Sequence, residues 1–308
     1  MGRVLLAGVP RSGTSWTGAA LGKTAGTTYV DEPDGFRGAY ALKVMLHRGE
    51  NPELAPGTPA IDYERLWMSA FAGGAMPHDV LGRLGSFAYK RASVASRRAA
   101  RAGGRMDPWV RLAVRAARPQ VAVPGSRHVL VKSVQCARSI EWIDEHFAPQ
   151  VVVLRRNPLN TVASWRDLEF VRNQRETADL VRYAKRVWNV GPPDESDQLA
   201  LQAFIVGVLS TALHEAARRH PSWTVVSHDE LCLDACTQLR ALAEELGLVW
   251  TDEADEFVLA SDRSGSGYLM NRVTNAQPYR WRDRLSSTEV DTIRRVLDAF
   301  PDGATVGP

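Results

Sequence analysis

The sequence of 308 residues is poor in cysteine, with Cys136, Cys232 and Cys236 as its only three. Three cysteines are too few for a disulfide framework, and so low a count is typical of a reducing compartment. Cys232 and Cys236 follow His228 at intervals of four, which would align three metal ligands along one helix. We expect His228 to end a strand instead, so the sequence predicts no metal site.

Long apolar runs are also missing. No segment approaches the roughly 18 to 20 continuous apolar residues that span a membrane. The first residues do not combine a basic leader with a long apolar core, so we expect no secretory signal and a cytoplasmic location. The composition, with 44% hydrophobic and 24% charged residues, predicts a globular protein with a sizeable core. The net charge of +3 fits anionic ligands but requires none.

A third absence is local. Residues 7–18 read AGVPRSGTSWTG and match the phosphate-loop pattern G-x-x-x-x-G-K-[ST] at Gly8, Gly13 and Ser15, but Thr14 replaces the lysine. Without that lysine, and without a convincing apolar strand ending in Asp to hold Mg²⁺, the loop does not fit ATP hydrolysis. Its backbone N–H groups can still wrap an anion, and the helix expected at 14–21 would point its positive end toward that anion.

The pattern of apolar residues predicts the fold. Continuous apolar runs alternate with helical patterns, which indicates a parallel sheet buried on both faces. We therefore expect an α/β fold with three layers, a parallel sheet flanked by helices, as in P-loop NTPases. The expected strands include 3–7, 129–131, 151–154 and 223–226, and the clearest helices are 14–21, 235–246 and one from 286 or 287 to about 300.

Residues 36–125 contain no convincing strand, so we expect a single domain over 1–308 with a helical insertion at 36–125. Within it, residues 83–118 hold ten Lys and Arg against one acid, Asp107, for a net charge of +9. This stretch would suit amphipathic helices on the inner, anionic face of a membrane, or a lid that attracts an acidic acceptor or the cofactor. A solvated helical face is equally compatible with it.

A second anion site is predicted at 151–165, VVVLRRNPLNTVASW. A buried strand ends in Arg155 and Arg156, Pro158 then starts or breaks a helix, and Ser164 follows Arg156 by two helical turns. A strand-end arginine suits bidentate contact with a phosphate, and a hydroxyl on the next helix adds a further hydrogen bond. Two anion sites in one sheet indicate a ligand with two separated phosphate-like groups.

The segments VPRSGTSW and VLRRNPLNTVASW together resemble the sulfotransferase family, which uses 3′-phosphoadenosine 5′-phosphosulfate (PAPS). The resemblance covers residues 4 to about 165 and is thinner beyond. It implies that Lys132, in VLVKS, faces the bridging oxygen and the sulfonate, and that Arg263, in SDRSGSG, helps to close over the 3′-phosphate. It assigns the 3′-phosphate to Arg156 and Ser164. It assigns the 5′-phosphosulfate to Arg11, Ser12, Gly13, Thr14, Ser15 and Trp16.

The general base is less direct to assign. Family members that modify small phenols and steroids have a His two residues after the lysine, where this sequence has Val134. Tyrosylprotein and trehalose-type sulfotransferases carry a Glu in the region where this sequence reads YVDEPDGF. The resemblance therefore implies Glu32 as the base that takes the proton of the acceptor hydroxyl, with Asp31 and Asp34 as alternatives. Lys132 and Arg11 would stabilise the charge that develops in transfer.

We therefore expect a PAPS-dependent O-sulfotransferase that needs no metal. Its acceptor would be a hydroxyl of a lipid, a glycolipid or another carbohydrate, or a different small molecule. Peripheral membrane contact through 83–118 is compatible with this function, a nucleic-acid partner is not expected, and the oligomeric state is open. Two alternatives remain, a nucleotide or nucleoside kinase with an atypical loop, and a nucleotide-binding or membrane-surface scaffold without catalysis.

Overall fold

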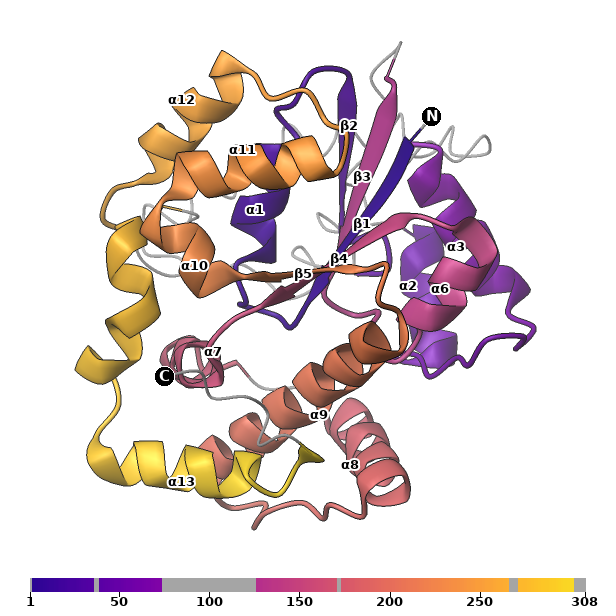
Figure 1. Ribbon diagram of the computed structural model, residues 1–308. Helices are drawn as coiled ribbons and strands as arrows, with labels where there is room; N and C mark the ends of the chain where they lie inside the picture. The colour runs from indigo at the N-terminus through magenta and orange to yellow at the C-terminus, as the bar shows by residue number, and fades with distance from the viewer. Residues whose placement is uncertain (1, 36–38, 74–125, 171–172, 266–270, 302–308) are drawn as a thin grey trace, which may run out of the picture.

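The computed structural model describes residues 2–35, 39–73, 126–170, 173–265 and 271–301. Five strands form one sheet in the order β2-β3-β1-β4-β5, and each of the four pairings is parallel (Figure 1). The strands are β1 (Gly2–Gly8), β2 (Thr27–Asp31), β3 (His128–Ser133), β4 (Gln150–Arg155) and β5 (Thr224–Ser227). The predicted parallel sheet is confirmed.

Side chains of the central strands alternate between two hydrophobic cores. Along β1, Leu5 and Ala7 belong to one core, whereas Val4 and Leu6 belong to the other, and all four are fully buried. Burial on both faces explains why these strands read as continuous apolar runs.

Helices cover both faces, which gives the predicted three layers (Figure 1). One face is covered by α1 (Thr14–Leu21), α10 (His228–Leu233), α11 (Ala235–Glu245) and α12 (Asp252–Ser261). The other face packs against α2 (Ala39–Arg48), α3 (Ile61–Phe71), α6 (Ile140–Phe147), α7 (Pro158–Asp167), α8 (Gln174–Trp188), α9 (Gln198–Arg219) and α13 (Ser287–Leu297). The 3₁₀ segment η1 (Thr274–Asp283) contacts α7 and α10.

The helix α9 is long and apolar enough to span a membrane, with 22 residues and a mean hydropathy of 1.4 in its most apolar window. However, 72% of that window is buried inside the protein, where Phe204, Val208 and Leu209 join the core. Most of the apolar surface of α9 is therefore buried in the core of the protein.

Three predicted helices begin and end close to the expected residues. The bounds of α1 are the predicted ones, α11 ends one residue early, and α13 begins after Ser286. Ser286 and Glu289 form a reciprocal capping box, in which each side chain accepts from the other residue's backbone N–H. In the expected insertion, the described residues form α2 and α3, while the basic stretch 83–118 lies outside the described residues.

The sheet places the predicted site residues along one edge. The carboxyl ends of parallel strands meet at the same edge, and the register pairs Asp31 with Lys132 and Ala7 with Ser133. On the other side of β1, Gly8 pairs with Leu154, directly before Arg155. Ligands of open α/β sheets bind outside this edge.

Candidate active site

The loop between β1 and α1 is built on two left-handed residues, Arg11 (φ 73°) and Gly13 (φ 97°). Gly13 is the N-cap of α1, and its carbonyl accepts from the backbone N–H groups of Trp16 and Thr17, both at 3.1 Å. A side chain at Gly8 would meet Ser12 Oγ at 2.6 Å. Glycine at both positions therefore allows the chain to fold tightly over the positive end of the helix.

Gly13 packs closely against His228, so a substitution at Gly13 tests the structure of the loop. A Cβ atom at Gly13 would lie 1.9 Å from the ring carbon Cδ2 of His228. We expect Gly13→Ala to lower the free energy of unfolding by at least ~2 kcal/mol, through backbone strain and displacement of the buried imidazole. Urea unfolding measures this. Gly57→Ala is the matched control, because Gly57 also has a positive φ, 75°, but has nothing within 4 Å of a Cβ. Equal losses in both variants would contradict the clash.

Arg156 forms the centre of the second predicted anion site. Its Nη1 donates to the carbonyl of Arg11 at 2.8 Å, and its Nη2 donates to Gln277 Oε1 at 3.4 Å. Burial lowers the pKa of Arg156 to about 10 despite the opposing charge of Asp229. Arg11 in turn donates from Nε to Ser164 Oγ at 3.1 Å. The structure thus brings the loop and the second site into contact.

The start of α7 fixes the position of Arg156. Asn157 is the N-cap, with its side chain accepting from the backbone N–H of Leu159, and Pro158 occupies the first turn. The backbone N–H of Asn157 donates to Asp229 Oδ2 at 2.7 Å, which ties the turn to α10. Pro158 therefore begins the helix, and Ser164 lies within the helix, as predicted.

Lys132 lies at the end of β3 with only 1% of its surface exposed. Its Nζ donates to Ser15 Oγ at 3.1 Å, to Asp31 Oδ1 at 3.2 Å and to Glu32 Oε1. The parallel register explains this contact, because Asp31 is paired with Lys132 and Glu32 donates its backbone N–H to the carbonyl of Lys132 at 2.7 Å. The Lys132 ammonium therefore contacts both the loop, through Ser15, and the predicted base, Glu32.

Asp34, the third acid of the segment, pairs with Ser133 and not with Lys132. It is 4% exposed and accepts a hydrogen bond from Ser133 Oγ at 2.6 Å. Burial raises the pKa of Asp34 from 3.8 to about 7. At neutral pH this buried carboxyl is therefore protonated in a large fraction of molecules.

The raised pKa of Asp34 predicts a dependence of stability on pH. The folded protein binds the proton more tightly than the unfolded chain, so the contribution is full below pH 3.8 and is lost as pH rises to about 7. Asp34→Asn does not titrate. As pH rises through this window, the wild type should therefore lose up to ~4 kcal/mol of its free energy of unfolding relative to the variant. Denaturant unfolding across pH 4 to 8 measures the difference, and a pH-independent difference would contradict the shift.

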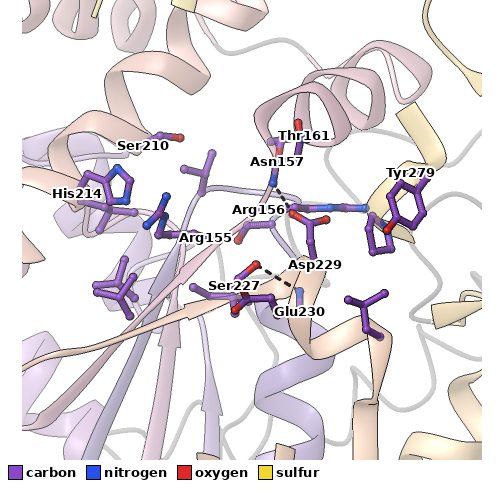
Figure 2. A pocket seen from close by; sticks show the side chains of 18 residues that line it. Arg155, Arg156, Asn157, Thr161, Ser210, His214, Ser227, Asp229, Glu230 and Tyr279 are labelled. Atoms are coloured by element: carbon purple, nitrogen blue, oxygen red, sulfur yellow. Dashed lines mark hydrogen bonds between the residues drawn. The ribbon is translucent and has the colours of Figure 1, made fainter. Parts of the chain in front are cut away.

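A cavity of about 410 Å³ lies beside Arg156 and reaches the side chains of α9 (Figure 2). Arg155, Ser210 and His214 lie on its α9 side, whereas Arg156 and Tyr279 lie on the opposite side. Its volume is within the range typical of small-molecule sites. Ser12 and Arg156 belong to both the cavity and the predicted anion site.

Two buried polar atoms at the junction have no hydrogen-bond partner among the residues that the structure describes. They are Ser12 Oγ and Arg156 Nε. A buried donor without a partner is costly, and a bound anion would supply acceptors for both. The residues present therefore fit a phosphate-bearing ligand.

The charge around Arg11 is more positive than predicted, because Arg272 lies close enough to Arg11 for the two charges to repel each other. Burial lowers the pKa of Arg272 to about 10, and repulsion from Arg11, Arg280 and Arg284 acts in the same direction. Arg272 was not among the predicted site residues. The only available signal was the basic composition of the C-terminal segment, in which Arg272, Arg280, Arg282 and Arg284 follow one another.

Arg263, which the resemblance selected instead, is exposed after the end of α12. With the Asn271 amide oriented to satisfy both groups, its oxygen accepts from Arg263 Nε at 2.8 Å and from Nη2 at 3.2 Å. Arg263 thus contacts Asn271, which precedes Arg272 in the chain. No contact of Arg263 with Arg156 or Ser164 occurs within the described ranges.

Trp16 lies beneath the loop rather than over it. Its indole N–H donates to Ser261 Oγ at 2.8 Å, and its ring meets the imidazole of His228 edge-on at 6.0 Å between centroids. Burial lowers the pKa of His228 well below its usual value, with Arg156 adding to the shift, so the ring is neutral. These two rings support the Gly13 side of the loop.

The expected strand end at His228 is wrong. β5 ends at Ser227, whose side chain caps α10 by accepting from the backbone N–H of Glu230, and His228 is the first residue of that helix. His228 and Cys232 are therefore one turn apart and in contact at 3.6 Å, whereas Cys236 lies in α11. Within the described ranges, no group of three His, Cys, Asp or Glu side chains could hold a metal ion.

Comparison with known proteins gives a likeness in fold and no match in sequence. No family model and no curated protein matches the sequence. Among solved structures, the protein is similar to the sulfotransferase domain from the curacin biosynthetic pathway, with a TM-score of 0.48 and 12% identity. The alignment covers 97% of this chain and 98% of that chain. A likeness at this level assigns neither a family nor an activity, so function has to be inferred from the site's own side chains.

Proposed function

We propose that the protein transfers a sulfonate group from PAPS to a hydroxyl of a small-molecule, lipid or carbohydrate acceptor. The observation that carries the proposal is the meeting of three features at one sheet edge. They are a phosphate loop without its lysine, a half-buried arginine with a buried serine, and a lysine paired with an acid. A nucleotide with two separated phosphate groups would match the first two features, and group transfer would use the third.

The loop and the arginines supply the binding. The 5′-phosphosulfate lies in the loop over the positive end of α1, with its oxygens bound to backbone N–H groups and to Ser15. The 3′-phosphate lies between Arg156 and Ser164, with Arg272 adding positive charge. Arg11 and Arg156 exchange their present partners, Ser164 Oγ and the Arg11 carbonyl, for oxygens of the nucleotide.

The transfer itself is an in-line displacement at sulfur. Glu32 accepts the proton of the acceptor hydroxyl while the hydroxyl oxygen forms its bond to sulfur. The bond from sulfur to the bridging oxygen breaks, and adenosine 3′,5′-bisphosphate leaves with that oxygen and its electron pair. Lys132 and Arg11 stabilise the negative charge that develops on the bridging oxygen and the sulfonate.

Ligand binding gives the first test of this proposal. Isothermal titration calorimetry should detect adenosine 3′,5′-bisphosphate in preference to ADP with Mg²⁺, because ADP has no 3′-phosphate for Arg156 and Ser164. Equal affinity, or a preference for ADP with Mg²⁺, would overturn the proposal and favour a kinase. A screen of cell extract with [³⁵S]PAPS then identifies the acceptor. Binding of the bisphosphate without any transfer would favour a scaffold without catalysis.

A further inference from the structure

The proposed base, Glu32, is held in an unfavourable backbone conformation. Its φ of 51° lies in the left-handed region, which non-glycine residues adopt only when their surroundings fix them there. A turn over residues 32–35 follows, in which the backbone N–H of Gly35 donates to the carbonyl of Glu32 at 3.1 Å. Pro33 presets this turn, and a Cβ at Gly35 would lie only 3.2 Å from the Glu32 carbonyl oxygen.

Asp34 anchors the far side of this turn to β3. Ser133 Oγ donates to Asp34 Oδ2 at 2.6 Å, and Ser133 Oγ itself accepts from the backbone N–H of Gln135 at 3.0 Å. The Gln135 side chain, with its amide oriented to satisfy both groups, donates to the Asp34 carbonyl at 2.5 Å. Consecutive residues of β3, Lys132 and Ser133, thus bind Glu32 and Asp34 of a single turn.

The surroundings of Asp34 shield it from solvent. The charged groups that act on it are Glu32 and Lys132, and its own charge acts on the Tyr63 hydroxyl of α3 and the Cys136 thiol. It is almost completely buried, and Ser133 occupies one of its oxygens. Asp34 is therefore poorly placed to take a proton from an acceptor and well placed to hold the turn.

We infer that Asp34 is a positioning residue for the proposed sulfonate transfer, which holds Glu32 against Lys132 through its hydrogen bond with Ser133. This inference rests on the proposed function. Without the anchor, the turn would relax from the left-handed conformation of Glu32, and the carboxylate would leave the ammonium. Lys132 would then be free to bind an anion, but the base would be lost from its place beside the sulfur.

A double-mutant cycle tests the inference without a known acceptor, with adenosine 3′,5′-bisphosphate as the probe in calorimetry. In the wild type, Glu32→Gln should tighten binding by roughly fivefold, because it removes a partner that competes for Lys132. In an Asp34→Ala background, the same change should alter the affinity less than twofold. Asp34→Ala alone should already tighten binding. Asp34→Asn keeps an acceptor for Ser133 and should behave as the wild type.

Two further variants control for folding. Ser133→Ala removes the same anchor from the other side and should uncouple Glu32 as Asp34→Ala does, which keeps the test open if Asp34→Ala does not fold. Asp62→Asn changes a carboxylate that is bound by Arg48 and His47 and does not belong to the turn over residues 32–35. It should leave the effect of Glu32→Gln unchanged.

A catalytic measurement adds a second readout. Release of [³⁵S]sulfate from PAPS, with water as the acceptor, should fall about tenfold in Asp34→Ala and little in Asp34→Asn.

Each outcome is decisive. An equal effect of Glu32→Gln in both backgrounds would overturn the positioning role, because independent sites give additive changes in binding free energy. The absence of any effect in the wild type would also overturn it, because the pairing that Asp34 is inferred to hold would not exist in solution. Failure of the wild type to bind the bisphosphate would instead overturn the proposed function.

Discussion

Arg156→Ala should reduce the affinity for adenosine 3′,5′-bisphosphate by roughly 100- to 1,000-fold, which corresponds to about 3–4 kcal/mol. The Nε of Arg156 is buried and has no partner within the described part of the chain, and the guanidinium lies between the loop carbonyl of Arg11 and Gln277. Under the proposed function, its removal would leave the 3′-phosphate without its main charged donor. Calorimetry measures the loss directly.

Two variants show whether that loss is specific. Arg156→Lys keeps the charge but not the planar donor pair, so we expect an intermediate affinity. Arg166→Ala removes an arginine from the same helix, where it binds Glu289 and Asp167 near the surface, and should leave the affinity within twofold of the wild type. Thermal unfolding confirms that each variant is folded. A wild-type affinity in Arg156→Ala would show that the second anion site lies elsewhere.

Glu32→Gln should change catalysis and binding in opposite directions. Transfer of [³⁵S]sulfonate to an identified acceptor should fall about 100- to 10,000-fold, because the amide cannot accept the hydroxyl proton. Binding of the bisphosphate should become tighter, because Lys132 loses its pairing with the carboxylate. A residue that only stabilised the fold would not produce this combination.

The control for Glu32 is a second pairing of lysine with glutamate. Lys23 Nζ contacts Glu253 Oε1 at 2.5 Å on the exposed surface, so Glu253→Gln removes the same chemistry away from the site. We expect neither transfer nor affinity to change. Near-normal transfer in Glu32→Gln would show that another group takes the proton, and Asp31, which also contacts Lys132, would be the next variant to measure.

The sheet was predictable from the sequence because its central strands are buried on both sides. β1, β3 and β4 carry uninterrupted runs of Val and Leu, and no other arrangement buries both faces of so many short runs. Helix ends were predicted closely where the local chemistry is strong, as at Ser286, whose capping box begins α13. His228 was placed wrongly, because a short strand and a short helix meet there without a glycine or proline to mark the boundary.

Local sequence patterns could indicate candidate site residues at strand ends, in the loop after β1 and on the helix after β4. Strand-end chemistry and the spacing of one helix were enough to select Arg156 and Ser164, and the loop motif selected Arg11. The hydrogen bond of Asp34 to Ser133 depends on the register of two strands that are about 100 residues apart, which local patterns do not encode. Arg272 was missed for a related reason, since its place depends on how the C-terminal segment folds back over the loop.

The order of the strands has a consequence for how the protein folds. β2 and β3 are neighbours in the sheet, yet residues 32–127 separate them in the chain, and β1 also pairs with β3 rather than with β2. Pairings across such long sequence separations close late, because the entropy of loop closure is lost before the contacts form. The contact between Lys132 and Glu32 therefore forms only when β2 joins the sheet, so the proposed transfer activity should return late on refolding.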